Sequence, residues 1–289
     1  MKKILFATEF STHTVEVFKY AADLAFFFKA KLIIMNAIGP PKNELSNILT
    51  LEERSEKAID KMVDLLFNNL SDEYRSKLKV EYSPQIGFAA DAILEVTSKK
   101  DIDLIVMGMT GKNNAFNVLV GSTTLSVLNK SSCPVLVVPA TAEFSGIENI
   151  VYTTNFEFRD LEAINYLKKL AKVFDASIHC LHIFENTENE GQIQKNFQIL
   201  QETYKKDKSL LFDIKKGNFE KEVNLFAKKK KADIVVMTAH KQNFIARMVK
   251  KNTVNELVQH IHLPLLVLKD TASSLKSNLW VGAPNSKNK

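Results

Sequence analysis

Two strand-like segments flank a glycine-containing loop in residues 104–139, LIVMGMTGKNNAFNVLVGSTTLSVLNKSSCPVLVVP. The apolar run 104–107 leads into a polar loop, a helical pattern covers Thr123 to Lys130, and a second apolar run occupies 135–138. Apolar runs rich in β-branched residues are typical of buried parallel strands. The order strand, loop, helix, strand predicts an open α/β sheet. Such a sheet collects anions where a strand ends opposite the start of a helix.

The loop contains three glycines whose positions suit contact with a ligand. Gly108 and Gly111 allow positive φ angles and let the backbone approach a bound group without a Cβ in the way. Gly121 and Ser122 fall where the helix begins, so free N–H groups and a hydroxyl are expected to face outward there. The helix dipole then favours a phosphate. The spacing fits neither the Walker A loop nor the dinucleotide-binding fingerprint.

The spacing G-x2-G-x9-G-S, formed by Gly108, Gly111, Gly121 and Ser122, resembles the ATP-binding signature of the universal stress protein family. The resemblance extends from the first strand candidate near the N-terminus to Pro139, and so covers most of the first 140 residues. It implies ATP as the ligand, with Mg²⁺ as a candidate companion of the phosphates.

The resemblance also implies which other residues contact the nucleotide. In the family, the end of the first strand contacts the adenosine part, and Glu9 stands where an aspartate is usual, which changes the reach of the carboxylate toward the ribose or a metal. Backbone atoms around Ala37 resemble the segment that bonds adenine, and Thr123 adds a hydroxyl or N–H near the phosphates. Lys112 either neutralises a phosphate or remains a flexible lysine in water. The expected binding set is Ala7, Thr8, Glu9, Ala37, Met107, Gly108, Gly111, Gly121, Ser122 and Thr123, with no catalytic and no metal-binding residue.

Strand and helix patterns alternate along the first half of the chain. Strands are predicted at 3–8, 31–37, 79–83, 103–107 and 135–138, and helices at 12–29, 51–69, 89–99 and 123–130. This alternation predicts a parallel sheet with right-handed crossovers. Together with the resemblance, it gives an expected α/β fold of two tandem Rossmann-like domains of the adenine nucleotide α-hydrolase type. Each is expected to be an open five-stranded parallel sheet of order 3-2-1-4-5.

The second half of the chain repeats the first. Residues 150–156 align with 4–10 at a separation of 146 residues, whereas 233–237 align with 103–107 at a separation of 130. The first copy therefore carries about 16 extra residues, and a period this long indicates two tandem domains. The expected boundaries are an ATP-binding domain at 1–141, a degenerate copy at 147–270 and a polar tail at 271–289.

The second copy has lost the glycine loop. Its four equivalent residues are Thr238, Lys241, Lys251 and Asn252, and lysine side chains would fill the space that a phosphate or ribose needs. A Cβ at a position that requires positive φ also costs about 1 kcal/mol or more. We therefore expect the second domain to bind no nucleotide. The alternative is that His240, Lys241 and Lys251 hold an anion in another way.

Composition argues against several classes of protein. The net charge of +6, with lysines scattered among acidic residues, fits a solvated surface better than a nucleic-acid groove. No apolar run approaches the ~18 residues of a membrane-spanning helix, so we expect a cytoplasmic protein without membrane contact. Cys133 and Cys180 are expected to be buried reduced thiols. His179 and His182 are expected on opposite faces of one strand, which argues against a shared metal.

Three functions remain open. The first is a regulatory stress-response protein that binds ATP in its first domain and is sensed by an unidentified protein partner. The second is slow ATP hydrolysis or self-phosphorylation on Ser122 or Thr123, although no general base is evident. The third is a nucleotide-free scaffold that acts by protein–protein contact. In the family, domains pair through their last strands, so 135–138 and 265–268 are expected to form a pseudo-dimer within one chain, and a homodimer of whole chains is also open.

Overall fold

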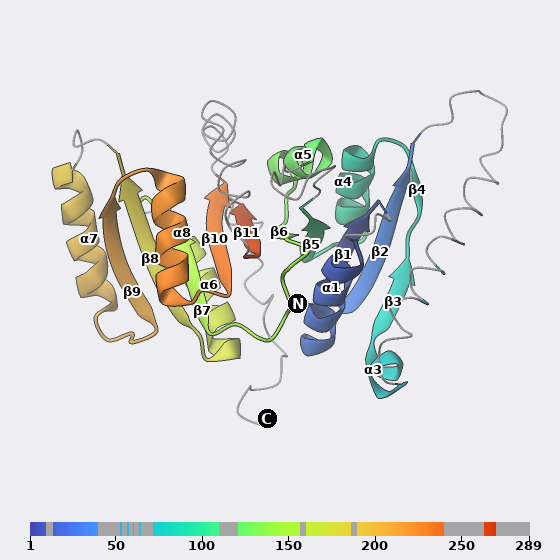
Figure 1. Cartoon of the computed structure of the whole chain (residues 1–289), viewed down its shortest axis with the longest axis horizontal. Helices are drawn as coiled ribbons and strands as arrows, with labels where there is room; N and C mark the ends of the chain where they lie inside the picture. The colour runs from blue at the N-terminus through green and yellow to red at the C-terminus, as the bar shows by residue number, and fades with distance from the viewer. Residues whose placement is uncertain are drawn as a thin grey trace. The chain divides into compact units, whose positions relative to one another are not determined.

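The computed structural model describes residues 1–9, 14–39, 72–109, 121–156, 160–185, 190–239 and 263–269, together with the helical positions 53, 57, 60 and 64 (Figure 1). These residues form two compact units. The first unit holds those up to Phe144, and the second unit holds those from Ser145 onward. Gly111, Lys241, Lys251, most of the helix predicted at 51–69 and the tail at 271–289 lie outside the described residues.

The first unit is built on a parallel sheet. Its main strands are β1 (Lys3–Thr8), β2 (Lys31–Ile38), β3 (Lys79–Tyr82), β5 (Leu104–Gly108) and β6 (Val135–Val138), in the spatial order β3-β2-β1-β5-β6. All of these neighbours pair in parallel, which confirms the predicted order 3-2-1-4-5. A short strand, β4 (Gln85–Ile86), continues alongside the end of β2 after a break at Pro84. Proline has no N–H to donate to a ladder, which accounts for the break.

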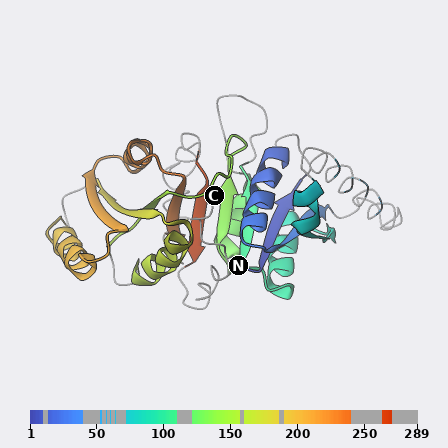
Figure 2. The ribbon, with the colours of Figure 1, turned by 90° about the horizontal axis from the view of Figure 1, so that it is seen from below.

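Helices cover both faces of this sheet. They are α1 (Thr14–Phe27), α3 (Asp72–Lys77), α4 (Ala89–Lys99) and α5 (Ser122–Lys130). α1 packs on β1 and β2, and Phe18 meets Phe6 edge to face with ring centroids 5.5 Å apart. α4 packs against α5, and Figure 2 shows α4 on the opposite side of the strands from α1. α3 docks on α1 through Tyr74, whose hydroxyl donates to Asp23 at 2.6 Å.

The second unit repeats this architecture. Its strands are β7 (Asn149–Thr153), β8 (Ser177–Phe184), β9 (Leu210–Lys216), β10 (Ile234–Ala239) and β11 (Leu265–Lys269). Their spatial order is β9-β8-β7-β10-β11, again with all neighbours parallel. Its helices are α6 (Asp160–Phe174), α7 (Glu190–Tyr204) and α8 (Phe219–Lys230). The internal repeat seen in the sequence is therefore a repeat of the fold.

The repeat extends to individual hydrogen bonds. Just before β5, the buried carboxylate of Asp103 accepts from the backbone N–H groups of Lys2 and Lys3 at 2.6 and 3.0 Å. In the second unit, Asp233 accepts from the two equivalent N–H groups at 2.7 and 2.8 Å. Each aspartate fixes the start of its unit's first strand against the start of the central strand. The two sheets consequently share the same register between these strands.

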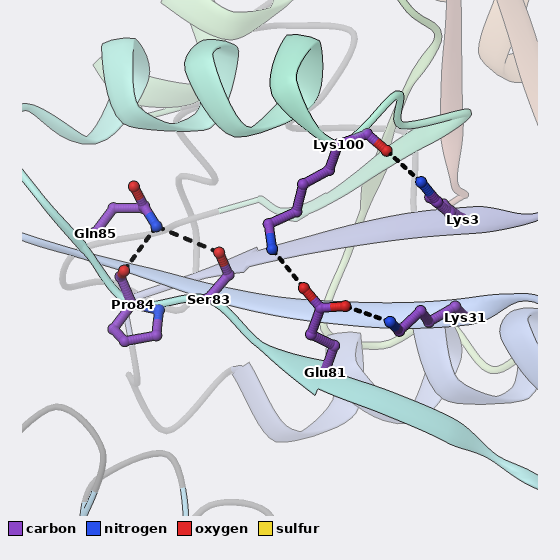
Figure 3. Close-up of polar contacts among 7 residues, drawn as sticks. All are labelled: Lys3, Lys31, Glu81, Ser83, Pro84, Gln85 and Lys100. Atoms are coloured by element: carbon purple, nitrogen blue, oxygen red, sulfur yellow. Dashed lines mark hydrogen bonds and ion pairs between the residues drawn. The ribbon is translucent and has the colours of Figure 1, made fainter.

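A carboxylate also joins neighbouring elements at the amino-terminal edge of the first sheet (Figure 3). Glu81 on β3 forms ion pairs with Lys31 on β2 and with Lys100, which follows α4. Lys3 on β1 donates from Nζ to the carbonyl oxygen of Lys100 at 2.7 Å. The hydrogen bonds from Lys100 and Lys31 hold the pKa of Glu81 below its ordinary value. These contacts stabilise the edge opposite the carboxyl ends of the strands.

Two further expectations can be compared with the described residues. Cys133 and Cys180 are both buried and free, as the sequence predicts. Burial raises the pKa of the Cys180 thiol far above its usual range, so it is unreactive. Within the described part of the chain, no helix combines the length and apolar character needed to cross a bilayer.

Candidate functional site

Strands β1, β2 and β5 end together at the carboxyl edge of the first sheet. Their register places Ala7 beside Met35 on β2 and Met107 on β5, and it places Thr8 beside Asn36. The residues that follow on the three strands therefore emerge at the same edge. The register brings together the predicted binding residues of the first, second and central strands, although about 100 residues separate them in the sequence. A parallel sheet of this kind presents its ligand crevice at this edge.

Accessibility separates the predicted binding residues into three groups. Glu9 and Ser122 are exposed, so their side chains are free to meet a ligand from solvent. The partly exposed members are Thr8, Ala37, Gly108, Gly121 and Thr123. Ala7 and Met107 are buried, at 9% and 5% exposure, so their side chains belong to the core and only their backbone is suited to a ligand.

Gly108 is the last residue of β5, and its φ angle is not positive. The positive φ that glycine allows is therefore not used at this position. The glycine is explained by packing, because a Cβ here would lie 3.3 Å from Cγ2 of Val17 on α1. A side chain at this position would push against α1, so the glycine lets the helix pack closely on the strand end. Gly111 lies outside the described residues.

The start of α5 presents N–H groups that have no partner within the helix. Gly121 is the residue before the helix, with extended φ and ψ of −63° and 151°, and its carbonyl oxygen accepts from Leu125 at 3.0 Å. The N–H groups of the first turn, including those of Ser122 and Thr123, have no carbonyl partner within the helix. They carry the positive end of the helix dipole. The helix begins one residue before the predicted Thr123, and Gly121 adopts a conformation that any residue can reach.

The same edge of the second unit contains a buried hydrogen-bond network. The Tyr152 hydroxyl donates to Asp160 at 2.8 Å and lies 3.0 Å from the hydroxyl of Thr238, which occupies the place of Gly108. The other oxygen of the Asp160 carboxylate accepts from the Thr154 hydroxyl at 2.7 Å and from the Asn155 N–H at 3.1 Å. Asp160 is only 1% exposed. Burial and the nearby carboxylate raise the pKa of Tyr152 well above its ordinary value, so the phenol remains a donor.

Aromatic side chains extend this network toward β8. The Nδ1 atom of His182 lies 2.8 Å from the carbonyl oxygen of Thr154, and its ring contacts Phe156 and Phe184 with centroids 5.4 and 6.4 Å away. His179 lies against Phe226 of α8 instead, with centroids 6.2 Å apart. The two histidines therefore face different neighbours, as strand alternation predicts. Among the described residues, no three His, Cys, Asp or Glu side chains gather to hold a metal.

The sequence led us to expect that lysine side chains fill the ligand space of the second unit, and it did not predict this hydrogen-bond network. Lys241 and Lys251 lie outside the described residues, whereas the polar difference that the structure shows at this edge comes from Tyr152 and Asp160. A signal was present in the internal repeat, because Tyr152 aligns with Phe6 and Asp160 with Thr14. Tyr152 adds a hydroxyl where Phe6 has none, and Asp160 adds a carboxylate where Thr14 has a hydroxyl.

The two edges therefore differ in chemistry. The first ends in a partly exposed Gly108, hydroxyls at Thr8 and Ser122, and the N–H groups that begin α5. Hydroxyls and oriented N–H groups suit an anionic ligand rich in oxygen atoms. In the second unit, the residue in place of Gly108 is already hydrogen-bonded within the protein.

Comparisons with known proteins agree with this fold. A model of the universal stress protein family matches the chain twice, at residues 1–139 and 146–269. Two universal stress proteins of Methanocaldococcus jannaschii are 31% and 27% identical over 145 and 152 residues; each match spans 47% of this chain and 81% or 94% of the relative. A solved universal stress protein from Archaeoglobus fulgidus superposes with a TM-score of 0.72 at 18% identity, covering 93% of this chain and 98% of that one. The fold, the repeat and the matches to both halves lead to one conclusion: this chain belongs to the universal stress protein family, with two copies of the family domain.

Proposed function

We propose that the first unit binds an adenine nucleotide, with ATP as the principal ligand, and that the chain acts as a regulatory stress-response protein in the cytoplasm. The observation that carries the proposal is the contrast between the two carboxyl edges. The first edge offers a partly exposed Gly108 and the N–H groups that begin α5. At the second edge the place of Gly108 is taken by Thr238, which is hydrogen-bonded into the buried network of Tyr152 and Asp160. One chain would therefore bind one nucleotide.

In this proposal the phosphates lie against the start of α5. Backbone N–H groups of Ser122 and Thr123 donate to phosphate oxygens, and the Ser122 hydroxyl adds a further donor. Gly108 is partly exposed at the end of β5, where its backbone is proposed to contact the ligand. Mg²⁺ would arrive with the phosphates, because this ion commonly keeps its waters and takes only one or two protein ligands; the exposed carboxylate of Glu9 is one candidate.

The adenosine part is proposed to lie over the ends of β1 and β2. Thr8 and Ala37 are partly exposed there, and backbone groups near Ala37 would bond the adenine edge. A regulator needs a change that a partner can detect. We propose that the bound nucleotide supplies this change by altering the conformation of the loop at 109–120, which an unidentified protein then recognises.

The proposal is tested by identifying what the purified chain carries. Small molecules are extracted under denaturing conditions and measured by mass spectrometry, and ATP, ADP and AMP are then titrated calorimetrically into stripped protein. We expect an adenine nucleotide in the extract and measurable binding of ATP. A Gly121→Leu variant serves as control: its backbone accepts leucine without strain, since φ is −63° and ψ is 151°, so it should keep its circular dichroism spectrum and lose the ligand. Absence of both co-purified nucleotide and ATP binding would overturn the proposal.

A further inference from the structure

Phe88 is the most exposed large apolar side chain among the described residues, at 71%. It is also the residue before α4, with φ of −72° and ψ of 129°, and it makes no side-chain capping bond. Its position calls for a residue that can accept a hydrogen bond from the first turn of the helix. Phenylalanine has no such acceptor. It leaves the helix start without a side-chain cap and exposes an aromatic ring to water.

The second unit shows what an ordinary residue does at the same position. There Asn218 precedes α8, and its side-chain oxygen accepts from the N–H of Lys221 at 3.0 Å. The glycine before it, Gly217, has Glu222 packed above it, with a Cβ position only 3.0 Å from the side chain. The equivalent Gly87 has φ of +138° and nothing within 4 Å of its Cβ position. In the second unit, therefore, Asn218 caps the start of α8 and Glu222 packs over Gly217. In the first unit the start of α4 has no side-chain cap, and the ring of Phe88 is exposed.

The chain before Phe88 is held firmly beside the end of β2. In Figure 3, Gln85 donates to the carbonyl oxygen of Pro84 at 2.7 Å and to Ser83 at 3.3 Å, at the break between β3 and β4. β4 then pairs with β2, so that Gln85 lies beside Ala37. The N–H of Gly87 donates to the carbonyl oxygen of Ile38 at 2.8 Å.

Phe88 therefore follows a segment fixed next to the strand end that the proposed function assigns to adenine. Ile86 adds a second apolar side chain to this corner, at 38% exposure. Aromatic rings bind nucleobases by stacking, which is favourable for any base with a free π-face.

We infer that Phe88 positions the base of the nucleotide, by packing its ring against the purine. This inference rests on the proposed function and adds a residue that the glycine signature does not contain. Phe88 explains how the site would retain adenosine as well as phosphate. It also explains why only the first unit lacks a capping residue at this position.

The test replaces Phe88 by the residue that the second unit uses. Phe88→Asn should cap α4 and leave the melting temperature unchanged or raise it, while ATP binding weakens by about tenfold, which corresponds to about 1.4 kcal/mol. Inorganic tripolyphosphate, which has no base, should bind this variant and the wild-type chain equally. Phe88→Tyr keeps the ring and should keep wild-type affinity for ATP. Leu225→Asn, at a 53% exposed position on α8, is a control that should change neither affinity.

The outcomes separate the inference from the proposed function. If the wild-type chain binds neither ATP nor tripolyphosphate, both fail. If the wild-type chain binds ATP and Phe88→Asn binds it equally well, the inference alone is overturned, and Phe88 becomes a candidate contact for a protein. If Phe88→Asn weakens ATP and tripolyphosphate to the same extent, the effect is not on the base and the inference is also overturned.

Discussion

Replacing Gly121 by aspartate separates nucleotide binding from folding, because it should affect them in opposite directions. Gly121 precedes α5 in an extended conformation that aspartate adopts without strain. Aspartate is a better residue than glycine at the start of a helix, by a few tenths of a kcal/mol, and its charge also favours the positive end of the helix dipole. We therefore expect the free energy of unfolding of Gly121→Asp to be unchanged or raised by about 0.5 kcal/mol.

The same carboxylate should repel a bound phosphate. Two unit charges about 4 Å apart interact with about 4 kcal/mol at an effective dielectric constant of about 20; at about 8 Å and a dielectric constant of about 40, the figure is about 1 kcal/mol. These limits correspond to a dissociation constant for ATP that rises by about fivefold to a thousandfold. Added salt should recover part of the lost affinity, since exposed charges are screened.

Calorimetric titration of ATP and urea denaturation measure the two effects on the same samples. Gly121→Asn has a similar shape and capping ability without the charge, so it should bind ATP more tightly than Gly121→Asp. Asn218→Asp places the same charge before α8 in the second unit and should leave ATP binding unchanged. A folded Gly121→Asp variant whose affinity for ATP is within twofold of the wild-type value would refute the placement of the phosphates at α5.

Two further predictions concern stability. Glu81→Gln should lower the free energy of unfolding at pH 7 by about 1 kcal/mol or less, because the two ion pairs with Lys31 and Lys100 are partly exposed. Since the folded-state pKa of Glu81 is depressed, its contribution is present above its ordinary value of 4.5 and is lost as the pH falls through the folded-state pKa. Urea titrations should therefore show that the free energies of unfolding of Glu81→Gln and wild type differ at pH 7 and converge below pH 4.5. An equal difference at both pH values would contradict this. Tyr152→Phe should destabilise the second unit by about 1–3 kcal/mol, because it removes the donor to buried Asp160, and should leave ATP affinity unchanged. Hydrogen exchange measured along β7 and α6 checks this, and unchanged protection of both segments would contradict it.

Local patterns in the sequence were sufficient for most of the secondary structure. α4 begins and ends at the predicted residues 89 and 99, and α5 begins one residue before the predicted Thr123. These boundaries depend on apolar periodicity and on the turn residues beside it. The predicted strand at 79–83 corresponds to β3, which ends one residue earlier, whereas the short strand β4 after Pro84 was not predicted. Pairing of β4 with β2 is a contact between distant residues, which a local pattern does not contain.

The candidate site was predicted less completely, for a physical reason. A glycine is compatible both with positive φ and with close packing, and at Gly108 the structure shows the second, through Val17. The network around Asp160 joins residues 152 and 238, which the sequence separates by 86 positions. The spacing of apolar residues in the sequence does not single out Phe88, because what distinguishes this residue is the exposure of its side chain at the start of α4. Each of these features depends on tertiary contacts that only the folded chain displays.

The central claim is that one nucleotide binds per chain, in the first unit. Native mass spectrometry of the full chain, at ATP concentrations from the wild-type dissociation constant upward, measures this number directly. We predict that the wild-type chain and Tyr152→Phe gain at most one nucleotide, and that a smaller fraction of Gly121→Asp is occupied at each concentration. A second nucleotide on the wild-type chain, or equal occupancy of Gly121→Asp and wild type at every concentration, would contradict this.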